Sequence, residues 1–352
     1  MNKIAQEKHN KVISGQQQLV DMFDRSISYL RVSLTDQCNL RCLYCSPKAI
    51  QDKLASGELL SYEELLRVIR IAAELGIKKV RLTGGEPLVR KNIDHFIHGL
   101  GEIPGLNDIR LTTNGVLLGK YAEKLYQAGV RKLNISLDTL KAERFQEITG
   151  ADLFDTVWAS IEKVLAMEFS PVKLNMVALK GINDDEIIDF ARLSLSHDVV
   201  VRYIEFMPIG KATLWSKERY LSSEEIQEKL KELGVLKPVQ RVHMDGPARI
   251  FDLIPHSSEA FRNKVGKVGF ISPISHQFCD KCNRLRLTSA GTLRSCLLSD
   301  QETDLKVILR SGGSDDEVRQ ALIQTILDKP KGHTLKEKGQ INCHGEMSRI
   351  GG

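Results

Sequence analysis

The stretch Cys38-Asn39-Leu40-Arg41-Cys42-Leu43-Tyr44-Cys45 places three cysteines at C-x3-C-x2-C spacing, directly after an apolar run at 29–35 that is typical of a strand. Thiolates are soft ligands that suit zinc or an iron–sulfur cluster. A closed site normally takes four protein ligands, yet no fourth cysteine or histidine lies near this loop, and the next histidine is His95. We therefore expect one metal position to stay open for a ligand that is not protein.

The loop resembles the cysteine loop of the radical S-adenosylmethionine (radical SAM) superfamily. In that superfamily three cysteines hold a 4Fe–4S cluster, and the fourth iron binds SAM through its amine and carboxylate. Tyr44 strengthens the resemblance, because the superfamily usually has an aromatic residue between the last two cysteines. Judged from the spacing alone, a structural zinc knuckle or three incidental thiols is the alternative.

The composition is that of an ordinary globular protein: of 352 residues, 42% are hydrophobic and 27% are charged. No apolar stretch approaches the roughly 20 residues that span a bilayer. Residues 1–18 are polar and lack the apolar core of a secretion signal. These features predict a cytoplasmic protein outside the membrane. The net charge of +5 is mild and only two tryptophans are present, which argues against a nucleic-acid binder.

Six of the seven cysteines fall in two clusters, which in a cytoplasmic chain indicates metal binding rather than disulfides. The second cluster consists of Cys279, Cys282 and Cys296. A zinc site would need a fourth ligand here. His276 is close enough in sequence to supply it, so zinc is a real alternative for this cluster. Cys343 is isolated, and we interpret it as an ordinary thiol.

Short β-rich runs alternate with amphipathic helices over residues 29–208. A capping box at Ser61 and an apolar stripe from Phe154 to Leu165 predict two of the helices. Six strand–helix units predict a parallel sheet, open or closed into a full or partial barrel, and no glycine-rich dinucleotide fingerprint follows the first strand. The resemblance to radical SAM enzymes implies an α/β fold with a partial (β/α)6 TIM-like barrel. The expected strands are 30–35, 79–83, 109–113, 132–137, 172–179 and 200–206.

The regular alternation of strands and helices ends after the sixth expected strand. Capping boxes at Ser222 and Ser314 predict helices that end at Leu233 and near Leu327, and the region 239–272 reads as short strands. Four parts are therefore expected: a flexible N-terminal extension at 1–20, a radical SAM partial barrel at 21–220, a C-terminal α+β extension with the second cluster at 221–340, and a mobile tail at 341–352 that ends in Gly-Gly.

The tetrapeptide Gly84-Gly85-Glu86-Pro87 follows the second expected strand directly. In a parallel α/β protein this is the carboxyl end of the strand, where ligands bind. Two glycines let the backbone approach a ligand closely. Alone, the motif would be an ordinary strand–helix turn. Behind a three-cysteine loop it resembles the radical SAM loop that contacts the ammonium group of SAM.

Basic residues interrupt otherwise apolar strands at Arg31, Arg81 and Lys173. A buried charge is costly unless it is paired or faces a cavity. These residues therefore predict a polyanion pocket, with side chains that reach water at strand edges as the alternative. Arginines near the second cysteine cluster indicate a bound anion there, since guanidinium groups pair with phosphate or carboxylate, although a solvated basic strand face would look the same. These are Arg284, Arg286 and Arg294.

Together with the C-terminal Gly351-Gly352, these motifs resemble one family closely over residues 21–352. It is the MoaA family of GTP 3′,8-cyclases, which act in molybdenum cofactor biosynthesis. The resemblance implies two 4Fe–4S clusters, held by Cys38, Cys42, Cys45, Cys279, Cys282 and Cys296. It implies contacts with SAM at Tyr44, Gly85, Ser136 and Met207. It implies contacts with GTP at Arg31, Arg81, Thr112 (or its neighbour Thr113), Lys173, Arg284, Leu285 and Arg286.

The resemblance also implies a mechanism. Reductive cleavage of SAM would give a 5′-deoxyadenosyl radical that takes a hydrogen from C3′ of GTP, and C3′ would then bond to C8 to give (8S)-3′,8-cyclo-7,8-dihydroguanosine 5′-triphosphate. Arg284 and Arg286 would stabilise charge, and the tail with Gly351 and Gly352 would insert into the cavity. A low-potential electron donor, a homodimer and a downstream cyclic pyranopterin monophosphate synthase are further implied. A peptide-modifying radical SAM enzyme with an auxiliary cluster, and a zinc-bearing nucleic-acid binding protein, are the alternative functions.

Overall fold

The computed structural model describes residues 19–45, 53–209, 215–240, 246–256, 261, 263–333 and 346–351. The strands are β1 (Tyr29–Ser33), β2 (Lys79–Thr83), β3 (Asp108–Thr113), β4 (Lys132–Ser136), β5 (Val172–Ala178), β6 (Val199–Glu205), β7 (Gly234–Pro238), β8 (Arg249–Pro255), β9 (Gly266–Ile271), β10 (Arg284–Leu287), β11 (Thr292–Arg294) and β12 (Thr303–Asp304). The α-helices are α2 (Tyr62–Glu74), α3 (Ile93–Gly101), α4 (Leu118–Gln127), α5 (Ala142–Thr149), α6 (Phe154–Ala166), α7 (Ile187–Ser196), α8 (Ser223–Leu230), α9 (Leu305–Arg310), α10 (Asp315–Leu327) and α12 (Met347–Ile350). Short 3-10 helices are η1 (Ser56–Glu58), η2 (Pro87–Val89), η3 (Asp184–Glu186), η4 (Lys217–Arg219) and η6 (Cys279–Lys281).

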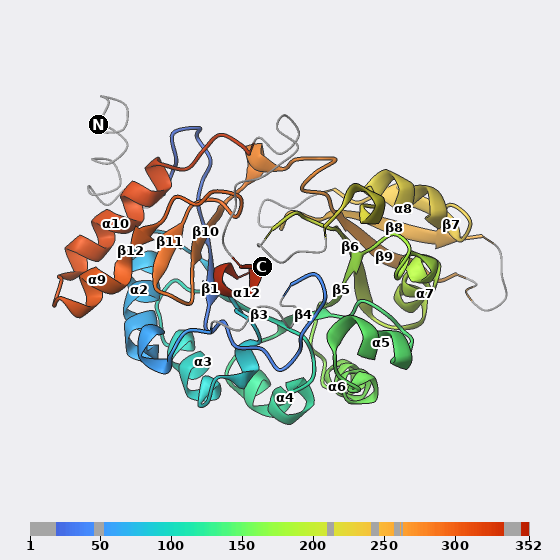
Figure 1. Cartoon of the computed structure of the whole chain (residues 1–352), viewed down its shortest axis with the longest axis horizontal. Helices are drawn as coiled ribbons and strands as arrows, with labels where there is room; N and C mark the ends of the chain where they lie inside the picture. The colour runs from blue at the N-terminus through green and yellow to red at the C-terminus, as the bar shows by residue number, and fades with distance from the viewer. Residues whose placement is uncertain are drawn as a thin grey trace.

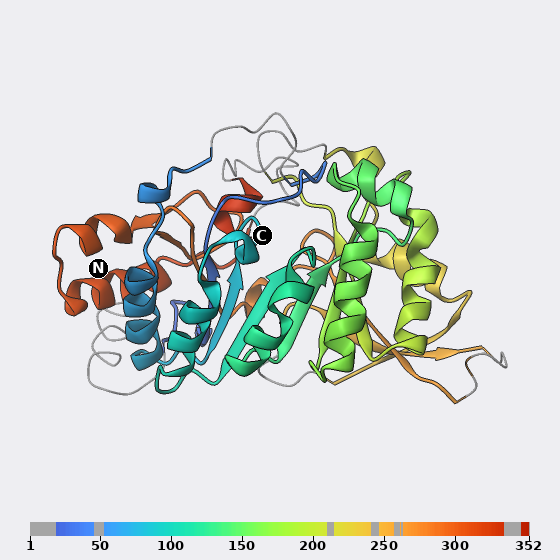
Figure 2. The same ribbon diagram turned by 90° about the horizontal axis from the view of Figure 1, so that it is seen from below.

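The strands form one sheet in the order β12-β11-β10-β1-β2-β3-β4-β5-β6-β9-β8-β7. Strands β1 to β6 are parallel, and each pairs with the next along the chain. Figure 1 shows this sheet curving around α12, with α2 to α7 on its outside. Figure 2 shows the outer helices side by side across the strands. Parallel strands covered by helices on the outside confirm the predicted partial (β/α)6 barrel.

The C-terminal region extends this sheet at both edges. Strand β10 pairs in parallel with β1, and β9 pairs in parallel with β6. The remaining edge strands are antiparallel. The sequence predicted an α+β extension here, but not that its strands would join the barrel sheet on two sides. Pairings between residues so distant in the chain leave no local pattern.

Side chains alternate between the two faces of the parallel strands. In β1, Leu30 and Val32 are fully buried in the apolar core that includes the outer helices. Arg31, between them, lines a cavity on the other face. The high Val, Ile and Leu content of these strands therefore reflects the outer face, while the inner face carries the polar residues described below.

The predicted capping boxes are present. Ser61 Oγ accepts a hydrogen bond from the Glu64 N–H at 3.1 Å, and Glu64 Oε2 accepts one from the Ser61 N–H at 2.6 Å. Ser222 and Ser314 begin α8 and α10 in the same way. The predicted end of α8 at Leu233 is wrong by three residues, because β7 begins at Gly234 and a turn must precede it. No helix in the described part of the chain is long and apolar enough to cross a membrane.

The expected outer boundaries fall partly on residues outside the described ranges. Of the predicted extension at 1–20, only Leu19 and Val20 are described, and Leu19 is buried in the core with 2% exposure. Packing therefore begins at least two residues before the predicted boundary. Of the predicted tail at 341–352, the structure describes 346–351, which include α12. The mobility of the tail stays a prediction.

Candidate active site

One cavity is lined by all six cysteines of the two clusters, which are free thiols. Most of the other residues predicted for the site line the same cavity: Arg31, Tyr44, Arg81, Gly85, Thr112, Ser136, Lys173, Met207, Arg284 and Arg286. Leu285 does not, because it alternates with its two arginine neighbours along β10 and its side chain lies in the apolar core at 1% exposure. Only the backbone of Leu285 is therefore available to a ligand on the cavity side.

The first cysteine loop is held to neighbouring elements at two points, Arg41 and Tyr44. The Arg41 N–H donates to the Thr149 carbonyl at the end of α5, at 2.8 Å. The Tyr44 hydroxyl donates to Asp138 Oδ2, just after β4, at 2.6 Å. The loop therefore spans from the end of β1 to the carboxyl ends of the strands on the other side of the cavity.

The glycine pair after β2 lies against this loop. A Cβ on Gly84 would come within 2.5 Å of the Thr35 carbonyl oxygen, and one on Gly85 within 2.2 Å of the Gln37 carbonyl oxygen. The Gly85 N–H also donates to the Thr35 carbonyl at 2.6 Å. From the sequence alone, the glycines are predicted to admit a ligand. In the structure, the closest approach that they permit is to the backbone that leads into Cys38.

Glu86 joins the ends of β2 and β3 to the cysteine loop. Its fully buried carboxylate accepts hydrogen bonds from Thr113 Oγ1 at 2.8 Å and from the Asn114 N–H at 2.7 Å. Asn114 Nδ2 in turn donates to Cys38 Sγ at 3.7 Å. Burial raises the pKa of Glu86 to about 7, although these hydrogen bonds oppose the shift. From the sequence alone, Glu86 is predicted only as part of a turn. The signal that could have singled it out is an acidic residue between glycine and proline.

The thiols of the first triad fit a cationic group. Burial raises the pKa of Cys38, raises that of Cys45 to about 12, and places that of Cys42 well above its usual range. Neighbouring thiolates add to the effect at Cys42 and Cys45. Three thiolates are therefore favoured only when a cation binds them, as the iron atoms of a cluster do. Among the described residues, no three His, Cys, Asp or Glu side chains are arranged to hold a single metal ion.

Four arginines lie side by side across the inner face of the sheet. They occupy paired positions on β10, β1, β2 and β3, and all line the cavity: Arg286, Arg31, Arg81 and Arg110. Neighbouring strands are about 4.8 Å apart, so these like charges repel one another, although Asp108 pairs with Arg110 at one end of the row. Burial, together with Arg81, lowers the pKa of Arg31 to about 10. A polyanion bound across this arginine row would relieve the repulsion.

The two threonines at the end of β3 face different partners. Thr112 Oγ1 accepts a hydrogen bond from Arg81 Nη1 at 3.3 Å, on the side of the arginine row. Thr113 is turned to Glu86 instead. Of the two, Thr112 is therefore the one placed beside the arginines.

Further polar residues of the cavity were not predicted from the sequence, among them Arg110, Lys79, Tyr29 and Arg202. Burial and the charge of Arg110 lower the pKa of Lys79 to about 8. Burial would raise the pKa of Tyr29, but nearby arginines, Arg81 above all, lower it to about 8. Arg202 donates to Asn175 Oδ1 through Nε at 2.9 Å and through Nη2 at 2.6 Å. The alternation of side chains along a strand was the available signal. Tyr29 and Lys79 lie two residues before Arg31 and Arg81, and residues two apart in a strand face the same side.

The second triad lies at the start of β10. Cys279 and Cys282 precede that strand, and Cys296 follows β11, which runs antiparallel to it. Burial raises the pKa of Cys279. At Cys282 burial acts in the same direction, but the positive charges of Arg284 and Lys329 outweigh it and lower the pKa to about 6. The second site is therefore already disposed to hold a thiolate.

Two residues that the sequence associated with the second triad face elsewhere. His276 Nε2 is hydrogen-bonded to Glu224 of α8. Arg294 forms ion pairs with Asp300 at 3.0 Å and with Glu302 at 3.2 Å. Neither residue belongs to the lining of the cavity. The described residues thus give no support to a zinc site completed by His276. Arg294 stabilises the local fold through its ion pairs and is not placed to bind an anion in the cavity.

The two triads lie at opposite ends of a pair of parallel strands. The first follows β1 at its carboxyl end, and the second precedes β10 at its amino end. A strand of four to five residues is roughly 13–17 Å long. The arginine row crosses the sheet between the two ends. A small anion held by that row would therefore have one triad on each side.

The chain end lies beside the ends of β1 and β2, and its Met347 lines the cavity. Arg286 Nη1 donates to the Gly351 carbonyl at 2.6 Å. Gly351 has a φ of 70°, and a Cβ there would lie 2.8 Å from Thr83 Cγ2. Ile350 packs in an apolar cluster that includes Met207. Gly352 lies outside the described residues, so its predicted role stays a prediction.

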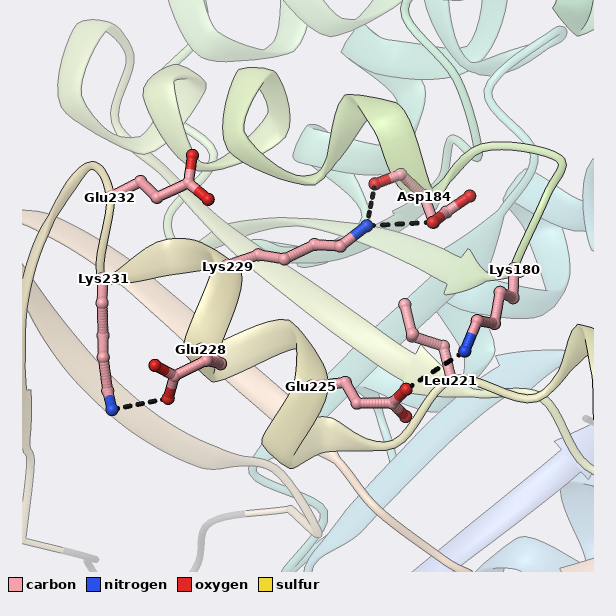
Figure 3. Close-up of a pocket in the computed structure, with 8 residues that line it drawn as sticks. All are labelled: Lys180, Asp184, Leu221, Glu225, Glu228, Lys229, Lys231 and Glu232. Carbon is pink, nitrogen blue, oxygen red and sulfur yellow. Dashed lines mark hydrogen bonds and ion pairs between the residues drawn. The ribbon is translucent and has the colours of Figure 1, made fainter.

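A second hollow lies on the outer surface near α8, and its charged side chains satisfy one another (Figure 3). Lys229 pairs with Asp184 at 2.9 Å, and Lys180 pairs with Glu225 at 3.3 Å. It has no cysteine and no arginine in its lining. The cysteine-lined cavity is therefore the candidate active site.

Comparison with known families divides the chain in two. Residues 32–194 match the Radical SAM superfamily, and residues 199–335 match the family described as Molybdenum Cofactor Synthesis C. Similar curated proteins are GTP 3′,8-cyclases. The one from Syntrophomonas wolfei subsp. wolfei is 44% identical, over 95% of this chain and 100% of the relative. The one from Thermodesulfovibrio yellowstonii is 47% identical, over 94% of this chain and 99% of the relative.

Among solved structures, the chain is similar to SuiB of Streptococcus suis bound to S-adenosylmethionine. The TM-score is 0.63 at 14% identity, and the match covers 92% of this chain and 70% of SuiB. SuiB bound to its precursor peptide SuiA gives the same TM-score. At this identity the likeness concerns the fold alone, so it does not favour a peptide substrate for this chain.

Proposed function

Because the chain belongs to the GTP 3′,8-cyclase family of radical SAM enzymes, we propose that it converts GTP into (8S)-3′,8-cyclo-7,8-dihydroguanosine 5′-triphosphate. This reaction would be the first step of molybdenum cofactor biosynthesis, in keeping with the family matched by its C-terminal half. The observation that carries the proposal is one cavity in which two cysteine triads flank a row of four arginines.

The first triad is proposed to hold a 4Fe–4S cluster, as the radical SAM family of this half of the chain implies. Bound with that cluster, SAM would supply the 5′-deoxyadenosyl radical on which the cyclisation depends. Tyr44, Gly85, Ser136 and Met207 would surround SAM. The hydrogen bonds of Glu86 support this arrangement, since they fix the glycine loop and the cysteine loop relative to each other.

The arginine row is proposed to bind the triphosphate. Arg31 and Arg81, with Thr112 and Lys173, would pair with phosphate oxygens, because planar guanidinium groups suit bidentate contacts with phosphate. The mutual repulsion of these neighbouring positive charges supports this role, since a bound anion would reduce it.

The second triad is proposed to hold another 4Fe–4S cluster, with an open iron that binds the guanine base. Arg284 and Arg286 would lie beside the base and stabilise charge there. Holding GTP at both ends would keep C3′ and C8 within reach of each other, and such positioning lowers the barrier of an intramolecular step. Gly351 and Gly352 would help to exclude water from the cavity.

The proposal also implies partners. A low-potential electron donor must reduce the first site, and a cyclic pyranopterin monophosphate synthase would consume the product. A homodimer is proposed from family resemblance. No specific observation favours the alternative functions of peptide modification or nucleic-acid binding.

An anaerobic assay tests the proposal. Protein reconstituted with iron and sulfide should bind about eight irons as two four-iron clusters, and with a reductant it should consume SAM and GTP and release the cyclised nucleotide, identified by mass spectrometry and NMR. About four irons with zinc at the second site would refute the two-cluster arrangement. Turnover of SAM without a GTP-derived product would refute the assigned substrate.

A further inference from the structure

A short segment after α10 wraps around the second cysteine triad. Gly332 lies against Cys279, since a Cβ there would be 3.7 Å from the Cys279 sulfur, and the His333 N–H donates to that thiol. Arg25 holds the segment in place from the other end of the chain. Its guanidinium donates to the carbonyls of Cys279 at 2.8 Å, Lys331 at 2.9 Å and Pro330 at 2.7 Å.

Arg25 is itself neutralised. It is 7% exposed, and its Nε pairs with Asp21 Oδ2 at 2.5 Å, a carboxylate that is fully buried. All of these contacts are to backbone carbonyls or to that one carboxylate. The charge of Arg25 is thus balanced within the protein, and its role is to fix the cysteine loop and the 329–333 segment together.

Lys329, at the start of the segment, differs from Arg25 in that no carboxylate pairs with it among the described residues. It is 4% exposed, and its ammonium donates to the carbonyls of Arg284, at 2.9 Å, and of Ser295. Within the described residues, these two carbonyl oxygens are its hydrogen-bond partners and no carboxylate pairs with it. A buried ammonium without an anionic partner is strongly unfavourable.

The negative charges that act on Lys329 are the thiolates of the second triad. Cys282 and Cys296 both act on Lys329 electrostatically, and Lys329 acts on Cys282 in return. The two carbonyls that it binds belong to Arg284, two residues after Cys282, and to Ser295, directly before Cys296. Lys329 is therefore attached to the backbone at two of the three ligands.

We infer that Lys329 is the counter-charge of the iron–sulfur cluster held by Cys279, Cys282 and Cys296, and that it sets the reduction potential of that cluster. The inference rests on the proposed second cluster. A fixed positive charge beside a cluster stabilises its reduced, more negative form, and so raises its potential. Removing the charge should make the potential more negative without removing a ligand.

The test separates charge from hydrogen bonding. Lys329→Gln keeps a donor for the carbonyls but removes the charge, whereas Lys329→Arg keeps the charge. Both are placed in a background of Cys38→Ala, Cys42→Ala and Cys45→Ala, in which only the second cluster can form. The midpoint potential is then measured by redox titration monitored by EPR, and iron per chain is measured alongside.

We expect the potential of Lys329→Gln to shift to more negative values and that of Lys329→Arg to stay near the parent value. Lys163→Gln is the matched control, since Lys163 also donates to a backbone carbonyl, that of Gly119 at 2.8 Å, but on the outer helix α6. It should leave the potential unchanged. Loss of the cluster in Lys329→Gln alone, with rescue in Lys329→Arg, would also support the charge role.

An unchanged potential in Lys329→Gln with full iron content would overturn the inference while leaving the two-cluster function intact. Loss of iron in both variants would overturn it too, because the cluster would then depend on the size and shape of the lysine side chain rather than on its charge. A parent protein that holds no second cluster would overturn both the inference and the proposed function.

Discussion

Tyr44 donates a 2.6 Å hydrogen bond to Asp138, and this bond ties the first cysteine loop to the segment that follows β4. Asp138 is held in turn by the Val177 N–H on β5, at 2.8 Å. Burial raises the pKa of Asp138 to about 6, while these two donors oppose the shift. The loop that would carry the first cluster is therefore positioned by the far side of the barrel as well as by its own strand.

Replacing Tyr44 by phenylalanine tests this link. A hydrogen bond of this kind contributes about 0.5–1.5 kcal/mol net, so Tyr44→Phe should weaken SAM binding to the reconstituted protein by about 2- to 12-fold. Isothermal titration with SAM measures the change. Tyr62→Phe is the control, because this substitution removes a comparable hydrogen bond, from the Tyr62 hydroxyl to the Lys91 carbonyl, on the outer surface. Equal effects in both variants would contradict a positioning role.

The two cysteine triads should fail in different ways. Cys42→Ala should abolish the reductive cleavage of SAM, since the first cluster would lose a ligand. Cys282→Ala should leave cleavage of SAM in place but abolish GTP binding and cyclisation. Product analysis by chromatography and nucleotide binding by equilibrium dialysis measure the two effects. Cys343→Ala, which changes the isolated cysteine, should behave as the parent. Normal GTP conversion by Cys282→Ala would show the assigned role of the second triad to be wrong.

Removing one member of the arginine row should have opposite effects on binding and on stability. Arg31→Met keeps the aliphatic stem but removes a charge that repels its neighbours. GTP affinity should fall by about 10- to 150-fold, because hydrogen bonds to charged groups contribute about 1.5–3 kcal/mol. The free energy of unfolding of the nucleotide-free protein should rise. Chemical denaturation and GTP titration measure the pair of effects.

Arg319→Met is the control for that experiment. Arg319 lies on α10 and pairs with Glu74 and Asp316, both at 2.7 Å. Its loss should leave GTP binding unchanged and should not increase stability. If Arg31→Met also lowered the free energy of unfolding, the charges of the row would be compensated within the protein. The row would then not be an uncompensated cluster that favours a bound anion.

GTP binding should weaken as the pH rises through about 8. Near that value Lys79 loses its positive charge and Tyr29 gains a negative one. Both changes reduce the attraction for an anion, so the Kd for GTP should increase between pH 7 and 9. Tyr29→Phe and Lys79→Met should each flatten the profile. The charged groups that face this pair come from β1, β2, β3 and β10: Arg31, Arg81, Asp108, Arg110 and Arg284.

The same two groups predict the opposite trend for stability. Both pKa values are lower in the folded protein than in the unfolded chain, so the unfolded chain binds more protons between about pH 8 and 10. The free energy of unfolding of the nucleotide-free protein should therefore rise over that interval, and this contribution is lost as the pH falls through 8. Denaturation curves at pH 8 and pH 10, with Tyr29→Phe for comparison, measure it.

The chain end should affect turnover more than binding. Deleting Gly351 and Gly352 should leave GTP affinity within about twofold of the parent and stop product formation. Gly351→Ala should act in the same direction, because its φ of 70° disfavours a side chain and a Cβ would meet Thr83. Gly312→Ala is a matched control with a φ of 79° and no atom within 4 Å. Turnover by the deletion variant at the parental rate would exclude a role for the tail.

The parallel half of the fold could be predicted from sequence because its signals are local. Each expected strand overlaps an observed one, and the range 79–83 matches β2. The capping boxes locate three helix starts. The pairing of β10 with β1, and of β9 with β6, could not be predicted, since contacts between distant residues leave no periodicity.

The site could be predicted where a residue violates the pattern around it. Arg31 and Arg81 were recognisable as charges within apolar strands, and the cysteines by their spacing. Tyr29 gave no such signal, because a tyrosine is common in a strand and its altered pKa arises only from arginines on neighbouring strands. Arg25 and Lys329 gave no such signal either, since the carbonyls that they bind belong to residues distant in the sequence.

The pairing of β10 with β1 also sets an order of events during synthesis. These strands are about 250 residues apart in the chain, so at roughly 5–20 residues per second the ribosome releases the first some tens of seconds before the second. Until then the edge of β1 has no neighbour on that side, and the anion pocket lacks Arg286. The three cysteines of the first triad are thus all synthesised well before the pocket that would recognise a nucleotide is complete.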